Sequence, residues 1–200
     1  MAINLVKGQR INIGLTELKV ELGWSVDPDL EPAPDPDVST FILGSNGKAI
    51  SEDHFVFFGS ENRIMTPEGE RPVSPDGSVI GAIDDLGDDE DGDGKGQEDV
   101  DVFLDKASND TKEMVFVVTI YNHTEGYNFG QIRDSYVKII NSENNDTLAI
   151  YELDEDFSTE TSVEFGRIYK KDSDWKFEAI GKGYNQGLDY LVKKYGLEVK

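Results

Sequence analysis

The residues best suited to chemistry lie in one acidic segment, 84–105, with the sequence DDLGDDEDGDGKGQEDVDVFLD. Asp89, Asp91, Asp93 and Gly94 have the spacing that begins the calcium loop of an EF-hand. Such a loop needs a bidentate glutamate six residues after the glycine, and Val100 stands there instead. The residues that follow alternate as in a strand and do not continue as a helix. The spacing excludes an EF-hand and leaves open another kind of metal site or a solvated acidic loop.

Calcium fits this segment better than other common ions. It accepts about six to eight oxygen ligands from a loop that can curl around it, whereas magnesium keeps several waters and uses fewer carboxylates. Glycines between the acids allow tight turns that expose backbone carbonyl oxygens. The candidate ligands in the segment are Asp84, Asp85, Asp91, Gly92, Asp93, Gly94 and Glu98.

The net charge of −22 is concentrated in three segments. Residues 84–105 carry a net charge of −10, residues 27–37 carry −5, and residues 152–156 carry −4. Such local like charge destabilises a folded chain unless a cation, a basic partner or solvent neutralises it. Nucleic acid and anionic lipid are disfavoured as direct partners, because each requires a lysine and arginine footprint that is missing here.

Residue types also limit the possible chemistry. There is no cysteine, which removes disulfides, thiol catalysis and the thiolate ligands usual in structural zinc sites. The two histidines, His54 and His123, are expected to be structural. No P-loop, nucleotide-binding glycine motif or nucleophile elbow is present. We therefore expect a protein that is not an enzyme.

The start of the chain, MAINLVKGQRINIGL, lacks the long apolar core of a signal peptide, and no apolar stretch has transmembrane length. These features predict a cytoplasmic protein.

Most apolar segments are short and alternate with polar residues, which is typical of strands. The predicted strands are Ile3–Val6, Ile11–Leu15, Leu18–Leu22, Val38–Leu43, Phe55–Phe58, Val100–Leu104, Met114–Tyr121, Tyr136–Ile140, Leu148–Leu153, Ser162–Tyr169 and Trp175–Ile180. Met114–Tyr121 is apolar at nearly every position and should lie centrally, covered on both faces. This pattern predicts a mainly all-β fold, an antiparallel β-sandwich with long acidic loops, as a single domain over residues 1–200.

Helical periodicity occurs near the end of the chain. In residues 183–196, Tyr184, Leu188, Leu191, Val192 and Tyr195 share one helical face, which predicts one C-terminal helix. A second short helix is expected near Gln131–Ser135.

Residues 59–99 contain few apolar residues and many glycines, and a loop of that length would be unusual without a function.

Several motifs follow one another along essentially the whole chain. They are LVKGQRINI, LKVELGW, Asp35–Ser39, Phe55–Phe58, Ser78-Val79 before Asp84-Asp85, Gly92–Glu98, Val117–Tyr121, Asn128–Gln131, Asp156–Thr161, Trp175–Phe177 and GKGYNQGL. In this order they resemble the TerD family, calcium-binding stress proteins associated with tellurite resistance.

The resemblance implies a β-sandwich that binds calcium through loops at one end. By matching position, the implied ligands are Asp35 and Asp37 from the first loop, with Asp84, Asp85, Asp93, Glu98 and the carbonyls of Gly92 and Gly94 from the second. The chain departs from the family pattern at Pro36, between the two aspartates, in an insertion at 86–90, and at Gly96-Gln97, where the family has two aspartates.

The leading hypothesis is therefore a non-enzymatic stress-response protein whose acidic loops are ordered by calcium and then present a surface to partners. The resemblance implies that these partners include other Ter-type proteins, one of them a membrane component, so that membrane association would be indirect.

Two alternatives stay open. One is a metal-dependent hydrolase that uses the clustered carboxylates, and the other is an acidic interaction module that binds no metal.

Overall fold

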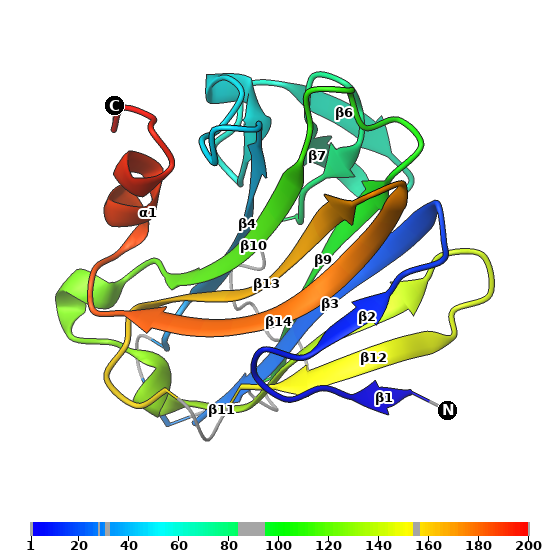
Figure 1. Cartoon of the computed structure of the whole chain (residues 1–200). Helices are drawn as coiled ribbons and strands as arrows, with labels where there is room; N and C mark the ends of the chain where they lie inside the picture. The colour runs from blue at the N-terminus through cyan, green and yellow to red at the C-terminus, as the bar shows by residue number, and fades with distance from the viewer. Residues whose placement is uncertain (1, 28, 31–32, 84–94, 154–156, 200) are drawn as a thin grey trace.

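Two six-stranded sheets pack face to face in the computed structural model, which describes residues 2–27, 29–30, 33–83, 95–153 and 157–199 (Figure 1). The first sheet contains, in spatial order, β1 (Ile3–Asn4), β12 (Thr147–Glu152), β11 (Ile132–Asn141), β3 (Glu17–Val26), β9 (Lys95–Phe103) and β8 (Val79–Ile80). The second contains β2 (Arg10–Asn12), β14 (Asp174–Tyr184), β13 (Ser162–Lys171), β10 (Glu113–Ile120), β4 (Pro36–Leu43) and β5 (Phe55–Val56).

The remaining elements are short. Strands β6 (Arg63–Thr66) and β7 (Gly69–Pro72) form a separate hairpin. Three 3-10 turns cover Glu52–His54, His123–Glu125 and Phe129–Gln131. The α-helix α1 (Leu188–Lys194) is the one α-helix within the described ranges. Neighbouring strands run antiparallel except β1 and β12, which are parallel. The predicted mainly-β class with one C-terminal helix is confirmed.

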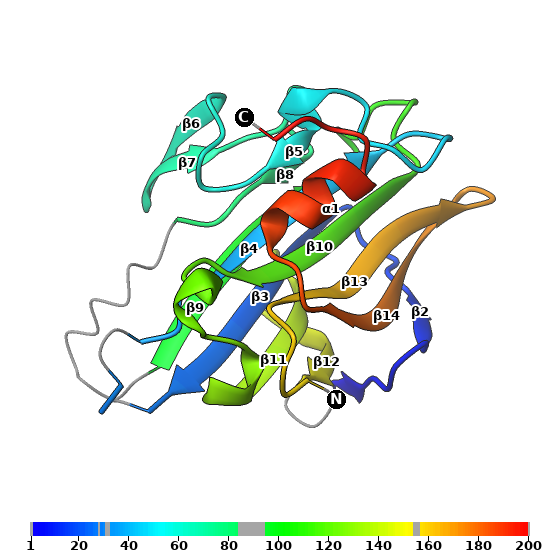
Figure 2. The ribbon, with the colours of Figure 1, turned by 90° about the vertical axis from the view of Figure 1, so that its left-hand side faces the viewer.

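Strand β10 is covered on both faces, as its sequence predicts. It lies between β4 and β13. Met114, Phe116 and Val118 face the core between the two sheets. Val115 and Val117 face the other way, into a smaller apolar cluster beneath α1. The second sheet is therefore sandwiched between the first sheet and the helix (Figure 2).

Two helical predictions need correction. The C-terminal helix is shorter than the 183–196 pattern, because Tyr184 still pairs with Ser162 as the last residue of β14. The helix predicted near Gln131–Ser135 is wrong. Ile132 already belongs to β11 and pairs with Val26 of β3, and only the 3-10 turn Phe129–Gln131 precedes it. Main-chain pairing within the sheets outweighs local helical periodicity at both places.

Helix α1 is attached to the second sheet by a buried carboxylate. Glu164 of β13 is 3% exposed and accepts hydrogen bonds from the hydroxyls of Tyr184, at 3.1 Å, and Tyr195, at 2.7 Å. Lys194, in the last turn of α1, forms an ion pair with the same carboxylate. Burial, and after it the charge of Glu164, raises the pKa of both tyrosines above the ordinary value. The network therefore fixes the position of α1 on the sheet.

We expect Glu164→Gln to lower the free energy of unfolding by about 1–3 kcal/mol, because it leaves the half-buried Lys194 ammonium without its countercharge. Urea unfolding followed by circular dichroism measures this. Glu125→Gln, at an exposed glutamate, is the matched control and should change stability by less than about 0.5 kcal/mol. Equal midpoints for the two variants would contradict the anchoring role of Glu164.

Candidate acidic metal site

The three acid-rich segments meet the first sheet at the same end. Strand β3 ends where segment 27–35 begins, β9 begins directly after 84–94, and β12 ends at Glu152. The register places Ser25 opposite Lys95, Val26 opposite Ile132, and Tyr136 opposite Glu152. Because these neighbours are antiparallel, the end of β3 lies beside the starts of β9 and β11 (Figure 2). Segments 27–37, 84–94 and 152–156, which together carry 16 of the 22 net negative charges, are thus joined to one end of the sandwich.

The structure describes only part of the predicted ligand set. Asp84, Asp85, Asp91, Gly92, Asp93 and Gly94 lie outside the described residues. Asp35, Asp37 and Glu98 lie inside them.

Glu98 is a strand residue and does not stand at the end of a loop. Strand β9 begins at Lys95, five residues before the predicted start at Val100, and Glu98 pairs with Leu22 of β3. Its side chain is 3% exposed, and Oε2 accepts a hydrogen bond of 2.6 Å from the backbone N–H of Val38. Since Val38 belongs to β4, this carboxylate joins the two sheets at the acidic end.

The backbone of residues 33–35, at the end of the first acidic loop, is held by hydrogen bonds to Tyr121 and Asn122. The carbonyl of Asp35 accepts from the N–H of Tyr121 at 2.8 Å, and the N–H of Asp35 donates to Oδ1 of Asn122 at 3.2 Å. Nδ2 of Asn122 donates to the carbonyl of Ala33 at 2.8 Å. These bonds fix the chain that leads from the loop into β4.

Asp37 lies next to the residue that Glu98 binds, but on the other face of β4. Alternation along a strand puts the side chains of Asp37 and Val38 on opposite faces. Val38 enters the core between the sheets, whereas Asp37 lines a hollow beside α1 with His123 and Leu188. The structure therefore brings β4 and β9 together while directing Asp37 and Glu98 to different sides of the sheet.

Asp35, Asp37 and Glu98 do not form a metal site by themselves. Within the described ranges, no three histidine, cysteine, aspartate or glutamate side chains gather in a way that could hold a metal ion. The donors that are present are hard oxygens, the type that calcium prefers. A calcium site at this end would need further oxygens from segment 84–94, which enters β9 beside them.

Arg71 is a buried residue that sequence reasoning missed. It is 5% exposed on β7 and donates to the carbonyls of Gly81 and Asp99, both at 2.8 Å, and to the carboxylate of Asp101 at 2.5 Å. Gly81 lies on the chain before segment 84–94 and Asp99 on the chain after it. One guanidinium therefore holds both stems of the acidic segment and attaches the β6–β7 hairpin to β9. The available signal for the hairpin was the turn sequence Thr66-Pro67-Glu68-Gly69.

Trp24 and Gly96 pack closely at the start of β9. The two residues are opposite in the β3–β9 register, and a Cβ on Gly96 would lie 2.3 Å from the Trp24 indole. Trp24 is buried and closes the core at the acidic end. The missing side chain of Gly96 therefore leaves room for the indole ring of Trp24.

Both histidines make short contacts within turns. Nδ1 of His54 lies 2.8 Å from the Ser51 hydroxyl at the start of a 3-10 turn, and burial lowers the pKa of His54. Nδ1 of His123 lies 3.0 Å from the carbonyl of Ile120. Both contacts are local to turns, as expected for structural residues.

Comparison with known proteins agrees with this architecture. The TerD domain family matches residues 1–195. The chain belongs to this family. General stress protein 16U of Bacillus subtilis (strain 168) is 37% identical over 207 residues, which cover 100% of both chains. Tellurium resistance protein TerD of Serratia marcescens is 32% identical over 204 residues, covering 98% of each chain.

The fold of this TerD-family chain is also found in solved structures. A homologue of telluride resistance protein (TerD) from Streptomyces coelicolor A3(2) superposes with a TM-score of 0.69 at 17% identity, covering 93% of this chain and 100% of that one. The names of these relatives describe resistance and stress, and none of them describes a reaction. A search of the described residues for a helix long and apolar enough to cross a membrane finds none.

We expect Gly96→Ala to lower the free energy of unfolding by about 1–3 kcal/mol, because the added methyl group must displace Trp24. Thermal unfolding measures the loss. Gly44→Ala is the control, since a Cβ there would meet its nearest atom at 3.7 Å, an ordinary contact. If Gly96→Ala lowers the free energy of unfolding no more than Gly44→Ala does, Trp24 can change position at little energetic cost.

Arg71→Lys should destabilise the protein by about 2–4 kcal/mol, because lysine keeps the charge but cannot make the forked set of hydrogen bonds. Arg10→Lys is the control and should cost less than about 1 kcal/mol, since the Arg10 side chain is mostly exposed and a lysine can keep its ion pair with Glu178. Chemical denaturation of both variants provides the comparison, and similar midpoints would contradict the proposed role of Arg71.

Proposed function

We propose that this TerD-family protein is a non-enzymatic, calcium-binding stress-response protein of the cytoplasm. The observation that carries the proposal is the convergence of the three acid-rich segments at one end of the first sheet. The ligands proposed are oxygens of Asp35, Asp37, Asp84, Asp85, Asp91, Gly92, Asp93, Gly94 and Glu98.

The charge distribution supports a cation as the partner of these segments. Like charges joined to one end of a small sandwich repel one another, and a bound divalent cation removes that repulsion. Calcium suits the chemistry because its coordination number is high and its geometry flexible. A ligand that binds only the folded chain also raises the free energy of unfolding, by about 2.7 kcal/mol at a concentration of 100 times Kd.

The names of the relatives support the stress-response part of the proposal. In this proposal, calcium orders the acidic segments, and the ordered surface binds partner proteins. These partners would include other Ter-type proteins, among them a membrane component, so that the chain itself would meet a membrane indirectly.

Calorimetric titration with calcium tests the proposal. We expect heat of binding and a rise in Tm of about 5–10 °C at saturating calcium. Glu98→Gln keeps an oxygen that can accept from Val38 but removes the charge, so it should weaken calcium binding about tenfold or more. Glu17→Gln, at the opposite end of the sheet, where Glu17 pairs with Phe103, should leave affinity unchanged.

The outcomes separate the proposal from its alternatives. Flat heat and an unchanged Tm at millimolar calcium would favour a metal-free acidic module. Metal-dependent turnover of a substrate would favour a hydrolase that uses the clustered carboxylates. Calcium binding that is equally strong in Glu98→Gln and Glu17→Gln would leave calcium binding intact but remove Glu98 from the site.

A further inference from the structure

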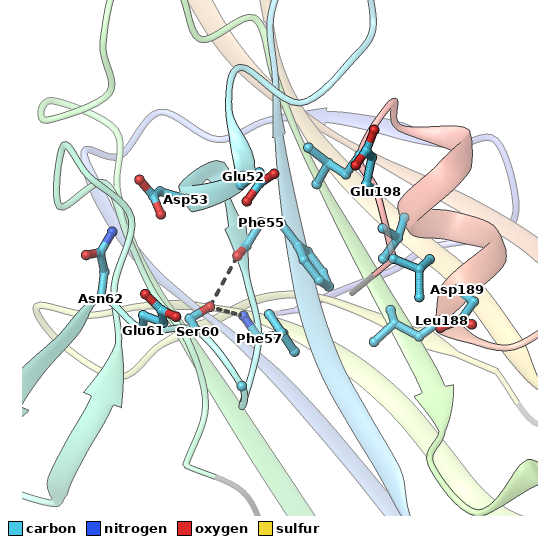
Figure 3. Close-up of a pocket in the computed structure, with 14 residues that line it drawn as sticks. Glu52, Asp53, Phe55, Phe57, Ser60, Glu61, Asn62, Leu188, Asp189 and Glu198 are labelled. Carbon is cyan, nitrogen blue, oxygen red and sulfur yellow. Dashed lines mark hydrogen bonds between the residues drawn. The ribbon is translucent and has the colours of Figure 1, made fainter.

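A hollow of about 340 Å³ lies on the other side of the second sheet from the core (Figure 3). One wall is the segment 52–62, and the other consists of α1 and the chain end at 197–199. The rings of Phe55 and Phe57 point into the space between these walls, opposite Leu188. The volume is within the range of about 300–1,000 Å³ that is usual for small-molecule sites.

The two rings on the floor of this hollow belong to a longer series of aromatic contacts. Ring contacts with centroids 4.3–5.8 Å apart connect six aromatic residues in the order Tyr195, Phe41, Phe55, Phe57, Phe58 and Tyr121. Phe41 is fully buried, Phe57 and Phe58 are half-buried, and Tyr121 is 63% exposed. Phe55 and Phe57 are the members of this series that line the hollow, and ring contacts connect them to the buried Phe41 on one side and to the exposed Tyr121 on the other.

Ser60 fixes the turn that carries the two central rings. Its hydroxyl accepts from the N–H of Phe57 at 3.1 Å and donates to the carbonyl of Phe55 at 3.2 Å. Figure 3 shows both bonds as dashed lines from Ser60 to Phe55 and Phe57. The floor is thus formed before any ligand arrives, which lowers the entropic cost of binding.

Exposed carboxylates stand on both walls. Glu52, Asp53 and Glu61 lie on one wall, and Asp189 and Glu198 on the other. No lysine or arginine occurs among the described residues that line the hollow. These acids are too widely spread to hold one metal ion, since the described residues contain no such group of three. The complementary ligand is apolar in the middle and positive at both ends.

We propose that this hollow binds an aliphatic polyamine. Its methylenes cover Phe55, Phe57 and Leu188, and its terminal ammonium groups reach the carboxylates of the opposing walls. The half-buried ring of Phe57 is compatible with this placement, because ammonium groups are attracted to aromatic rings within about 6 Å. The site is independent of calcium, since it shares none of its lining residues with the proposed calcium ligands.

Spermidine is the probe for this site, titrated into the full chain by calorimetry at about 0.15 M salt, where long-range attraction between charges is screened. Saturating calcium is present, so that the acidic end of the first sheet is neutralised beforehand. We expect one spermidine to bind per chain. Asp189→Asn combined with Glu61→Gln should weaken binding at least tenfold, and Phe57→Ala should weaken it as well.

A matched double variant, Glu17→Gln with Glu143→Gln, removes two charges from exposed residues, one in β3 and one in the turn between β11 and β12. It should change spermidine affinity by less than twofold. 1-Hexylamine, which has an apolar body but one charge, should bind more weakly than hexane-1,6-diamine. Magnesium at the same ionic strength should compete poorly, because it has no apolar part.

Three results would overturn the proposal. The first is the same loss of affinity in both double variants, which would indicate general attraction to a negative chain. The second is full competition by magnesium. The third comes from amide chemical shifts of the wild-type protein, which do not depend on any variant folding. Shifts confined to β9 and the start of β4, with none at Phe57, Leu188 or Val192, would place spermidine at the acidic end.

Discussion

Repulsion among carboxylates at one end of the first sheet is the constraint on which the rest of the structure depends. The register of β3 with β9 and β11 brings the acid-rich segments to that end, so the neighbouring elements must hold their stems against electrostatic expansion. Arg71 binds the chain on both sides of segment 84–94. Glu98 joins β9 to β4 across the two sheets. The strands thus keep the stems of these segments close together, and the proposed calcium ion would relieve the resulting repulsion.

The fold class could be predicted because buried strands show a local pattern, the alternation of apolar and polar residues. Val100, Val102 and Leu104 point inward as their spacing predicts, and β10 is covered on both faces. The start of β9 was missed because Lys95–Asp99 contains no apolar residue, so no alternation marks it as a strand. These residues form a strand because they pair with β3, which is distant in the sequence. The β6–β7 hairpin was missed for a related reason, since its apolar residues Ile64 and Met65 are exposed and belong to no core.

The candidate site was predictable in its residue types but not in its geometry. Density of acids identified the segments, and the family resemblance added Asp35 and Asp37. Nothing in the sequence indicates that Asp37 faces α1 while Glu98 is buried between the sheets. That difference arises from the alternation of β4 and its contact with β9. A buried arginine such as Arg71 is equally invisible, because its partners are mostly backbone carbonyls distant in the sequence.

The close contact of Trp24 with Gly96 has a spectroscopic consequence. The chain has two tryptophans, and Trp24 is the one that packs against the strand entered directly by segment 84–94. Trp175 lies at the start of β14 in the second sheet. Replacing Trp175 with phenylalanine would leave a single indole at the acidic end. Its emission wavelength and quenching by iodide or acrylamide would then report hydration of that end directly, without an attached dye.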